Sequence, residues 1–200
     1  MYLCIDTATE HSGIALVGNG KKNSFLPLER THTSDDIIKK IDQLIKKADI
    51  RLSDLRGVFV VRGPGSFTGL RVGISVANQF AHQLEIPIIG ICCDELRSFA
   101  ILDKDYFYIQ SMNAEQVYVV GYGQYKKDYP REIISISEFR HELISNPGSA
   151  IFGQINEKHR EYFKDIKILK SKTPLDEVWS KLAKANPFNS HRKYALIEPY

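Results

Sequence analysis

The sequence is poor in the residues that build disulfide frameworks and metal sites. It has three cysteines among 200 residues, Cys4, Cys92 and Cys93, and each lies in or beside an apolar, strand-like run. An odd number at this spacing suits neither a set of disulfides nor a zinc site. We therefore expect buried, reduced thiols and a cytoplasmic protein.

The net charge is not concentrated in either half of the chain, and hydrophobic residues form no long run. The formal net charge is +3 and is shared between the two halves, so there is no polybasic arm of the kind that supports tight RNA binding on its own. No apolar run approaches the roughly 20 residues of a membrane span. Met1–Asp6 lacks the basic region of a signal peptide. These features predict a globular protein without membrane contact.

Several catalytic motifs are also missing. None of the six histidines has a second histidine four residues away, and His141-Glu142 is followed by Ser145 where a zinc peptidase needs histidine. Ser66 does not lie in Gly-x-Ser-x-Gly, the motif of serine hydrolases. We predict no catalytic residue, no metal ligand and no cofactor, which disfavours a peptidase.

The chain is organised around Arg62–Gly73, with the sequence Arg-Gly-Pro-Gly-Ser-Phe-Thr-Gly-Leu-Arg-Val-Gly, which we call the glycine signature. An apolar run at 57–61 precedes it and a helical pattern at 67–84 follows it, which predicts strand, turn and helix. Ser66 or Thr68 can cap the helix. The spacing matches neither a P-loop nor a dinucleotide fingerprint. Two interpretations stay open: an anion site at the helix N-terminus, or glycines required for packing.

Hydrophobic periodicity predicts the same element order, βββαβα, in each half of the chain. Strands are predicted at 2–7, 13–17, 23–28, 57–61 and 87–91, and helices at 34–48 (capped by Thr33 or Ser34), 67–84 and 94–102. In the second half, strands are predicted at 106–111, 116–122, 132–136, 150–153 and 166–169, and helices at 137–145, 156–164 and 174–184. We place an N-terminal lobe at 1–102 and a smaller lobe at 103–200. Two such lobes are typical of the actin-like, RNase H-like α/β fold of actin, sugar kinases and Hsp70.

The first predicted strand ends in a turn that resembles the phosphate-gripping turn of those ATPases. Its residues Asp6, Thr7 and Thr9 are candidates for a vestigial phosphate site, although an aspartate at a strand end also serves as a simple turn cap. The corresponding hairpin tip of the second half, Met112–Glu115, contains no aspartate. We predict no catalysis by the chain alone. A small ATPase or sugar-kinase-like phosphotransferase, using this turn and Gly63–Gly69, remains the alternative.

The glycine signature closely resembles that of the TsaB (YeaZ) family. Ile5–Thr9, Ile86–Ile91 and the ending Ile197–Tyr200 are similar to family stretches in the same order. Two stretches depart from the pattern: Thr33 stands where the family usually has histidine, with His32 displaced by one, and Asn113-Ala114-Glu115 replaces Asp-Ala-Arg.

The resemblance implies a non-catalytic partner subunit. In the family, TsaB pairs with the TsaD transferase and with the TsaE ATPase. The complex makes N6-threonylcarbamoyladenosine next to the anticodon of tRNAs that read A-starting codons. The chain is accordingly expected to form a homodimer as well, and to reach tRNA only through the complex.

The resemblance also implies that helices 34–48 and 67–84 contact the TsaD partner or a second copy. Independently, apolar and small residues cover about 200° of helix 67–84, twice the stripe that one sheet face requires. The row Gly69, Gly73, Ala77 and Ala81 would permit close helix–helix approach. The alternative is that helix 67–84 is covered entirely within its own lobe. The sequence does not determine which edge of the apolar arc would face a partner. The predicted interface residues are Ser34, Ile37, Ile38, Ile41, Gly65, Ser66, Phe67, Thr68, Gly69, Arg71, Val72, Gly73, Val76 and Ala77.

Overall fold

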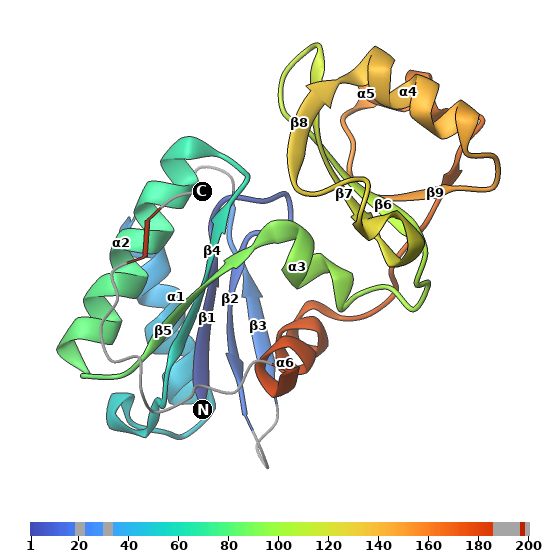
Figure 1. Cartoon of the computed structure of the whole chain (residues 1–200). Coiled ribbons are helices and arrows are strands. Elements are labelled where there is room, and N and C mark those ends of the chain that lie inside the picture. The colour runs from blue at the N-terminus through green and yellow to red at the C-terminus, as the bar shows by residue number, and fades with distance from the viewer. Residues whose placement is uncertain (19–22, 30–33, 186–196, 199–200) are drawn as a thin grey trace. The chain divides into compact units, whose positions relative to one another are not determined.

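A computed structural model describes residues 1–18, 23–29, 34–185 and 197–198 (Figure 1). Contacts divide these residues into two compact units. Unit 1 comprises residues 1–99 together with the described residues from 173 onward, and unit 2 comprises Ala100–Lys172. His32 and Thr33, where the chain departs from the family pattern, and Pro199 and Tyr200, which belong to the resembling C-terminal stretch, lie outside the described residues.

Unit 1 is built on a mixed five-stranded sheet of order β3-β2-β1-β4-β5. The strands are β1 (Tyr2–Asp6), β2 (Gly13–Val17), β3 (Ser24–Pro27), β4 (Val58–Gly63) and β5 (Ile88–Cys92). β1, β2 and β3 form an antiparallel meander, and β4 and β5 run parallel to β1. The register places Ile5 of the central strand between Ile14 and Val60. Apolar side chains therefore line up across the sheet and form one face of the core.

Helices cover both faces of this sheet (Figure 1). α1 (Ser34–Lys47) contacts β2 and β3, while α2 (Phe67–Gln83) contacts β1, β4 and β5. The other face carries α3 (Cys93–Ser98) and α6 (Leu175–Ala185). α1 and α2 enclose the alternate residues Leu3 and Ile5, as the two-residue period of a strand dictates.

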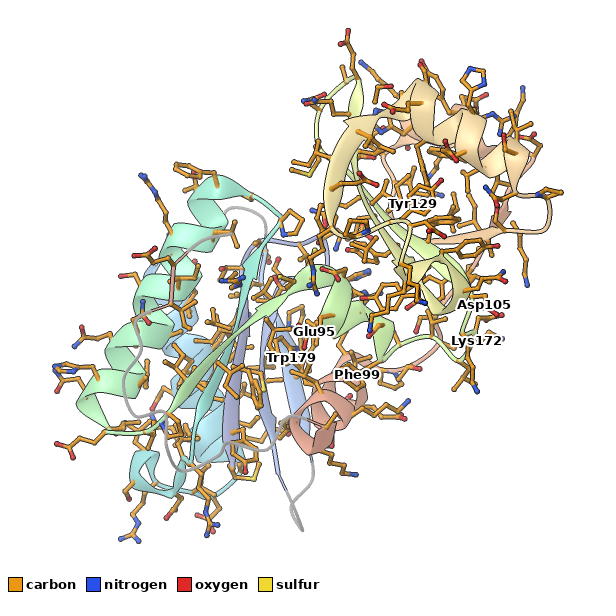
Figure 2. All side chains as sticks on the ribbon, in the orientation of Figure 1. Glu95, Phe99, Asp105, Tyr129, Lys172 and Trp179 are labelled. Carbon is orange, nitrogen blue, oxygen red and sulfur yellow. The ribbon has the colours of Figure 1, made fainter. Side chains whose placement is uncertain are left out.

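α6 corrects the predicted lobe boundary. It contacts β2, β3 and α3 of unit 1, and its Trp179, labelled in Figure 2, is 1% exposed. The second lobe therefore ends at Lys172 and does not run through residues 103–200. The reason is burial: Val178, Trp179 and Leu182 form the apolar stripe of an amphipathic helix, and unit 1 provides the surface that covers them.

Unit 2 repeats the topology of unit 1, in strand order β10-β9-β6-β7-β8. Its strands are β6 (Tyr106–Ser111), β7 (Gln116–Tyr122), β8 (Glu132–Ser135), β9 (Ala150–Gln154) and β10 (Lys167–Ile168). Its helices are α4 (Ile136–Ser145) and α5 (Glu157–Arg160). Phe107, at the centre of the core, contacts the rings of Phe139 and Tyr129, the latter labelled in Figure 2. The predicted βββαβα order is thus confirmed in both halves.

Most predicted elements agree with the structure to within a residue or two. The helix expected at 94–102 already ends at Ser98, and the one expected at 156–164 is the short α5 followed by a 3-10 turn, Glu161–Phe163. The three cysteines are buried and form no disulfide, as predicted, and burial raises the pKa of the Cys4 thiol. Among the helices that the structure describes, none is long and apolar enough to cross a membrane.

Candidate functional site

The turn after β1 is closed by its own side chains. The buried Asp6 carboxylate accepts hydrogen bonds from the backbone N–H groups of Ala8 (3.0 Å) and Thr9 (3.1 Å) and from the Thr9 hydroxyl (2.6 Å). Thr9 Oγ1 in turn accepts the backbone N–H of His11. Asp6 and Thr9 are therefore bound to their own turn, the geometry of an aspartate that caps a turn.

The glycine signature is joined to this turn by hydrogen bonds. Gly63, at the end of β4, has a φ of 126°, a backbone conformation that favours glycine. Ser66 caps α2, because its Oγ accepts the N–H of Gly69 at 3.3 Å, and its own N–H donates to the carbonyl of Ala8 at 3.0 Å. Thr7 Oγ1 donates to the carbonyl of Gly69 at 2.6 Å. These bonds fix the first turn of α2 against the end of β1.

The glycines at positions 65, 69 and 73 allow this close approach. A Cβ at Gly65 would lie 2.7 Å from the carbonyl oxygen of Ala8. At Gly69 it would overlap the carbonyl oxygen of Thr7, and at Gly73 the Thr7 hydroxyl. Packing inside unit 1 is thus sufficient to explain the glycine spacing, which favours the second of the two interpretations that the sequence left open.

Part of the predicted interface lies inside unit 1. Ile37 (0% exposed), Ile41 (2%) and Ala77 (0%) belong to the core beneath α1 and α2, and Gly73 is buried against Thr7. Gly73, Ala77 and Ala81 of the small-residue row are buried against the sheet and the β1 turn, and these three are not available for approach by a helix of another chain. Ile37, Ile41, Gly73 and Ala77 are therefore removed from the predicted contact surface.

The apolar arc of α2 is also partly covered within the chain. Val72, Val76 and Phe80 are half-buried and pack against the core, and α2 touches α1. Asn78, a polar residue of α2, exchanges two hydrogen bonds with the backbone of Ile197, at 3.0 and 3.1 Å. This contact joins residues 119 positions apart, and no sequence signal predicted it.

An exposed part of the predicted surface remains at the start of α2. Phe67 is 62% exposed, and the Arg71 guanidinium carbon lies 4.1 Å from the centre of its ring. On α1, Ile38 is 45% exposed, whereas the side chain of Ser34 lies outside the described part. We call the following residues the α2 surface: the exposed Ser66, Phe67, Thr68, Arg71, Ser75 and Gln79, with the half-buried Gly65, Gly69, Val72 and Val76.

The hairpin tip of unit 2 is closed in a way that parallels the β1 turn. Asn113 Oδ1 accepts the backbone N–H groups of Glu115 (3.0 Å) and Gln116 (2.9 Å), and its Nδ2 donates to the Gln116 side chain at 2.7 Å. Asn113, where the TsaB family has aspartate, thus caps its own turn. Among the described residues, no group of three or more His, Cys, Asp or Glu side chains is placed to hold a metal ion.

Asp6 provides a test of this structural role. Burial raises its pKa above the ordinary value of 3.8, against the hydrogen bonds from Thr9 and Ala8 and the charge of Arg97. Asp6→Ala should lower the free energy of unfolding by about 3 kcal/mol, because it leaves buried N–H groups without acceptors. Asp6→Asn should cost less, about 1 kcal/mol, because its amide oxygen can still accept the two backbone N–H groups, and only the bond from the Thr9 hydroxyl to the second oxygen is lost.

The raised pKa of Asp6 also predicts how its contribution to stability changes with pH. The folded protein binds the Asp6 proton more tightly than the unfolded chain, so this group's stabilisation is lost as pH rises through the folded-state pKa. Asp6→Asn lacks this loss, and its stability relative to the wild type should increase over that range. Urea denaturation of both proteins from about pH 4 to about pH 8 measures the difference between their free energies of unfolding. A difference that stays constant over this pH range would contradict a raised pKa of Asp6.

The structure is similar to that of YeaZ from Pseudomonas aeruginosa, with a TM-score of 0.66, 17% sequence identity and 92% of each chain covered. The two units have sheets of the same topology. Together with the similarity to YeaZ, this defines an α/β protein of the actin-like, RNase H-like fold. A family model described as TsaD, tRNA N6-adenosine threonylcarbamoyltransferase, matches residues 27–132, more than half of the chain.

Two curated relatives refine this assignment. The chain is 39% identical over 90 residues to the tRNA threonylcarbamoyladenosine biosynthesis protein TsaB of Escherichia coli, across 44% of this chain and 38% of that protein. It is 40% identical over 62 residues to the tRNA N6-adenosine threonylcarbamoyltransferase of Geotalea daltonii, across 31% of this chain and 18% of that protein. The chain belongs to the TsaD family and, within it, to the TsaB (YeaZ) group.

Proposed function

We propose that the chain is a non-catalytic subunit in the synthesis of N6-threonylcarbamoyladenosine in tRNA. The observation that carries the proposal is the family match over residues 27–132, which includes α1, α2 and the whole glycine signature. The similarity to the E. coli TsaB protein, named for the same biosynthesis, supports it. The catalytic partner would be a TsaD-type transferase, to which part of this chain is similar.

The closed turns support the non-catalytic part of the proposal. Both carboxylate oxygens of Asp6 already accept hydrogen bonds within unit 1, and Thr7 and Thr9 donate to Gly69 and Asp6. In unit 2 the side chain of Asn113 is occupied in the same manner. Phosphate or Mg²⁺ would have to displace these bonds. Asp6, Thr7 and Thr9 are therefore proposed as the remnant of a phosphate turn that now holds α2 in place.

The α2 surface is the proposed docking site for the transferase. Phe67 and Arg71 are of residue types that are enriched at protein interfaces. Their mutual contact at 4.1 Å holds the guanidinium over the ring, which restricts both side chains before binding. The same surface, with Ile38, would also serve a second copy of the chain. We propose further that a TsaE-type ATPase joins the pair, that tRNA is reached through this complex, and that the complex works in the cytoplasm.

Co-purification with the transferase homologue of the same organism tests the proposal. The tagged chain, co-expressed with that homologue, should elute with it from a size-exclusion column, and tRNA modification should require both proteins. The chain alone should neither bind Mg-ATP with micromolar affinity in titration calorimetry nor hydrolyse it. ATP turnover by the chain alone, abolished in Asp6→Asn, would instead support the phosphotransferase alternative.

A further inference from the structure

The charges of unit 2 are distributed unevenly along the sequence. Between residues 100 and 156 there are five lysines and arginines against seven acidic residues. Between residues 157 and 172 there are six lysines and arginines against three acidic residues. We call residues 157–172 the basic segment. The positive excess of unit 2 is thus confined to 16 consecutive residues.

The basic segment comprises α5, the 3-10 turn and β10. Its last part lies at one edge of the sheet of unit 2, because β10 is the terminal strand in the order β10-β9-β6-β7-β8. Beyond β10 the chain continues along the sheet, because the N–H of Leu169 donates to the carbonyl of Ile151 at 2.8 Å. Its five lysines are all exposed, namely Lys158, Lys164, Lys167, Lys170 and Lys172, the last of which is labelled in Figure 2.

The five lysines of the basic segment are not held in ion pairs within the described structure. None of the five forms an ion pair with a residue that the structure describes. The acidic Asp165 of the same segment is already neutralised, because Arg140 of α4 contacts its two oxygens at 2.5 and 2.7 Å. The lysines are therefore available to a negatively charged partner.

An exposed aromatic ring lies in the same segment. Tyr162 is 45% exposed, and its ring meets that of His159 edge-on, with the centroids 6.4 Å apart. His159 is buried and held by Ser111 Oγ (2.9 Å) and by the carbonyl of Ala114 (3.2 Å). Tyr162 thus stands on a fixed support with part of its surface open to solvent. Free cations beside an exposed aromatic ring suit a nucleic-acid strand, which offers phosphates and stacking bases.

We propose that the basic segment is a contact surface for the phosphate backbone of RNA. The proposal rests on the proposed function in that the RNA would be the tRNA substrate. It adds that this chain touches that RNA itself. A linear polyanion fits because the exposed Lys167, Lys170 and Lys172 follow one another within six residues that begin at the edge strand β10. With a formal net charge of only +3 for the whole chain, the contact would add to the affinity of a complex.

The test measures tRNA binding by the complex of the full-length chain with its transferase homologue, using fluorescence anisotropy of a labelled, unmodified tRNA transcript over a series of NaCl concentrations. Lys167→Ala/Lys170→Ala removes two charges from the basic segment. The matched control Lys126→Ala/Lys127→Ala removes two exposed charges elsewhere in unit 2. For the first variant, the decrease of the logarithm of the tRNA association constant with the logarithm of the NaCl concentration should be less steep by about 1.4, at roughly 0.7 per lost phosphate contact. Its binding of tRNA should be about 10-fold weaker than that of the wild type at ~0.1 M NaCl. The control should match the wild type.

Each other outcome contradicts the proposal. A slope and affinity equal to those of the wild type, in an intact complex, would show that the segment does not touch RNA. Loss of the transferase with the basic-segment variant alone would assign the surface to a protein partner. If the wild type forms no complex, the proposed function fails, and the same two variants are compared on the chain alone at low salt. If the chain alone does not bind RNA, or if the basic-segment variant and the control variant show equal salt slopes, the proposed RNA contact is wrong, independently of the proposed function.

Discussion

Replacing Gly69 with alanine is expected to lower the free energy of unfolding of unit 1 by about 3 kcal/mol. A methyl group at this position overlaps the backbone carbonyl oxygen of Thr7, which cannot move without displacing the end of β1. Overpacking of this kind costs typically 1–3 kcal/mol. The hydrogen bond from Thr7 Oγ1 to Gly69 contributes about 1 kcal/mol more, and the better helix propensity of alanine offsets about the same amount. Against a typical total of 5–15 kcal/mol this is a large loss.

The neighbouring glycine allows an internal control. At Gly73 the added methyl meets side-chain atoms of Thr7 and no backbone, so Gly73→Ala should cost less than Gly69→Ala and should be partly rescued in the double variant with Thr7→Ala. Thr7→Ala should not rescue Gly69→Ala, because the clash there is with backbone. Ser75→Ala, exposed on the same helix, should change stability by less than about 0.5 kcal/mol. Urea denaturation followed by circular dichroism measures the stability of each of these variants. Equal stability of Gly69→Ala and Ser75→Ala would disprove the packing account.

Replacing Phe67 with alanine should weaken binding of the transferase about 30-fold or more. A central aromatic residue at an interface typically contributes at least about 2 kcal/mol when truncated, and about 1.4 kcal/mol corresponds to a tenfold change in the dissociation constant. Phe67 is 62% exposed, so its removal should leave the fold of the isolated chain intact. The variant also frees the Arg71 guanidinium from its position over the ring.

Titration of the chain into its transferase homologue measures this effect. Leu52→Ala is the matched control: Leu52 is an exposed apolar residue of unit 1 (42%), on the 3-10 turn Leu52–Asp54 and outside the α2 surface, and its loss should not change affinity. Ala81→Glu should instead unfold unit 1, because Ala81 is 2% exposed in the core and a buried, unpaired charge costs several kcal/mol. Unchanged affinity of Phe67→Ala would move the docking site away from the start of α2.

The sequence alone determined the order of the elements and the family. Strand and helix periods are local: alternation places Leu3 and Ile5 on one side of β1 whatever covers that side. The cap of α2 is local as well, since Ser66 reaches an N–H only three residues away. The glycine signature, a string of adjacent residues, carries the resemblance to the TsaB family for the same reason.

The tertiary structure decided which surfaces those elements bury. The glycine row of α2 could equally have met another chain or a phosphate, and its contact with Thr7 depends on a hydrogen bond between residues 62 positions apart. Asn78 meets Ile197 across 119 positions, and α6 returns to unit 1 after all of unit 2 has intervened. No local pattern encodes such pairs, because each partner is specified only by the shape and the unpaired groups of a distant part of the chain.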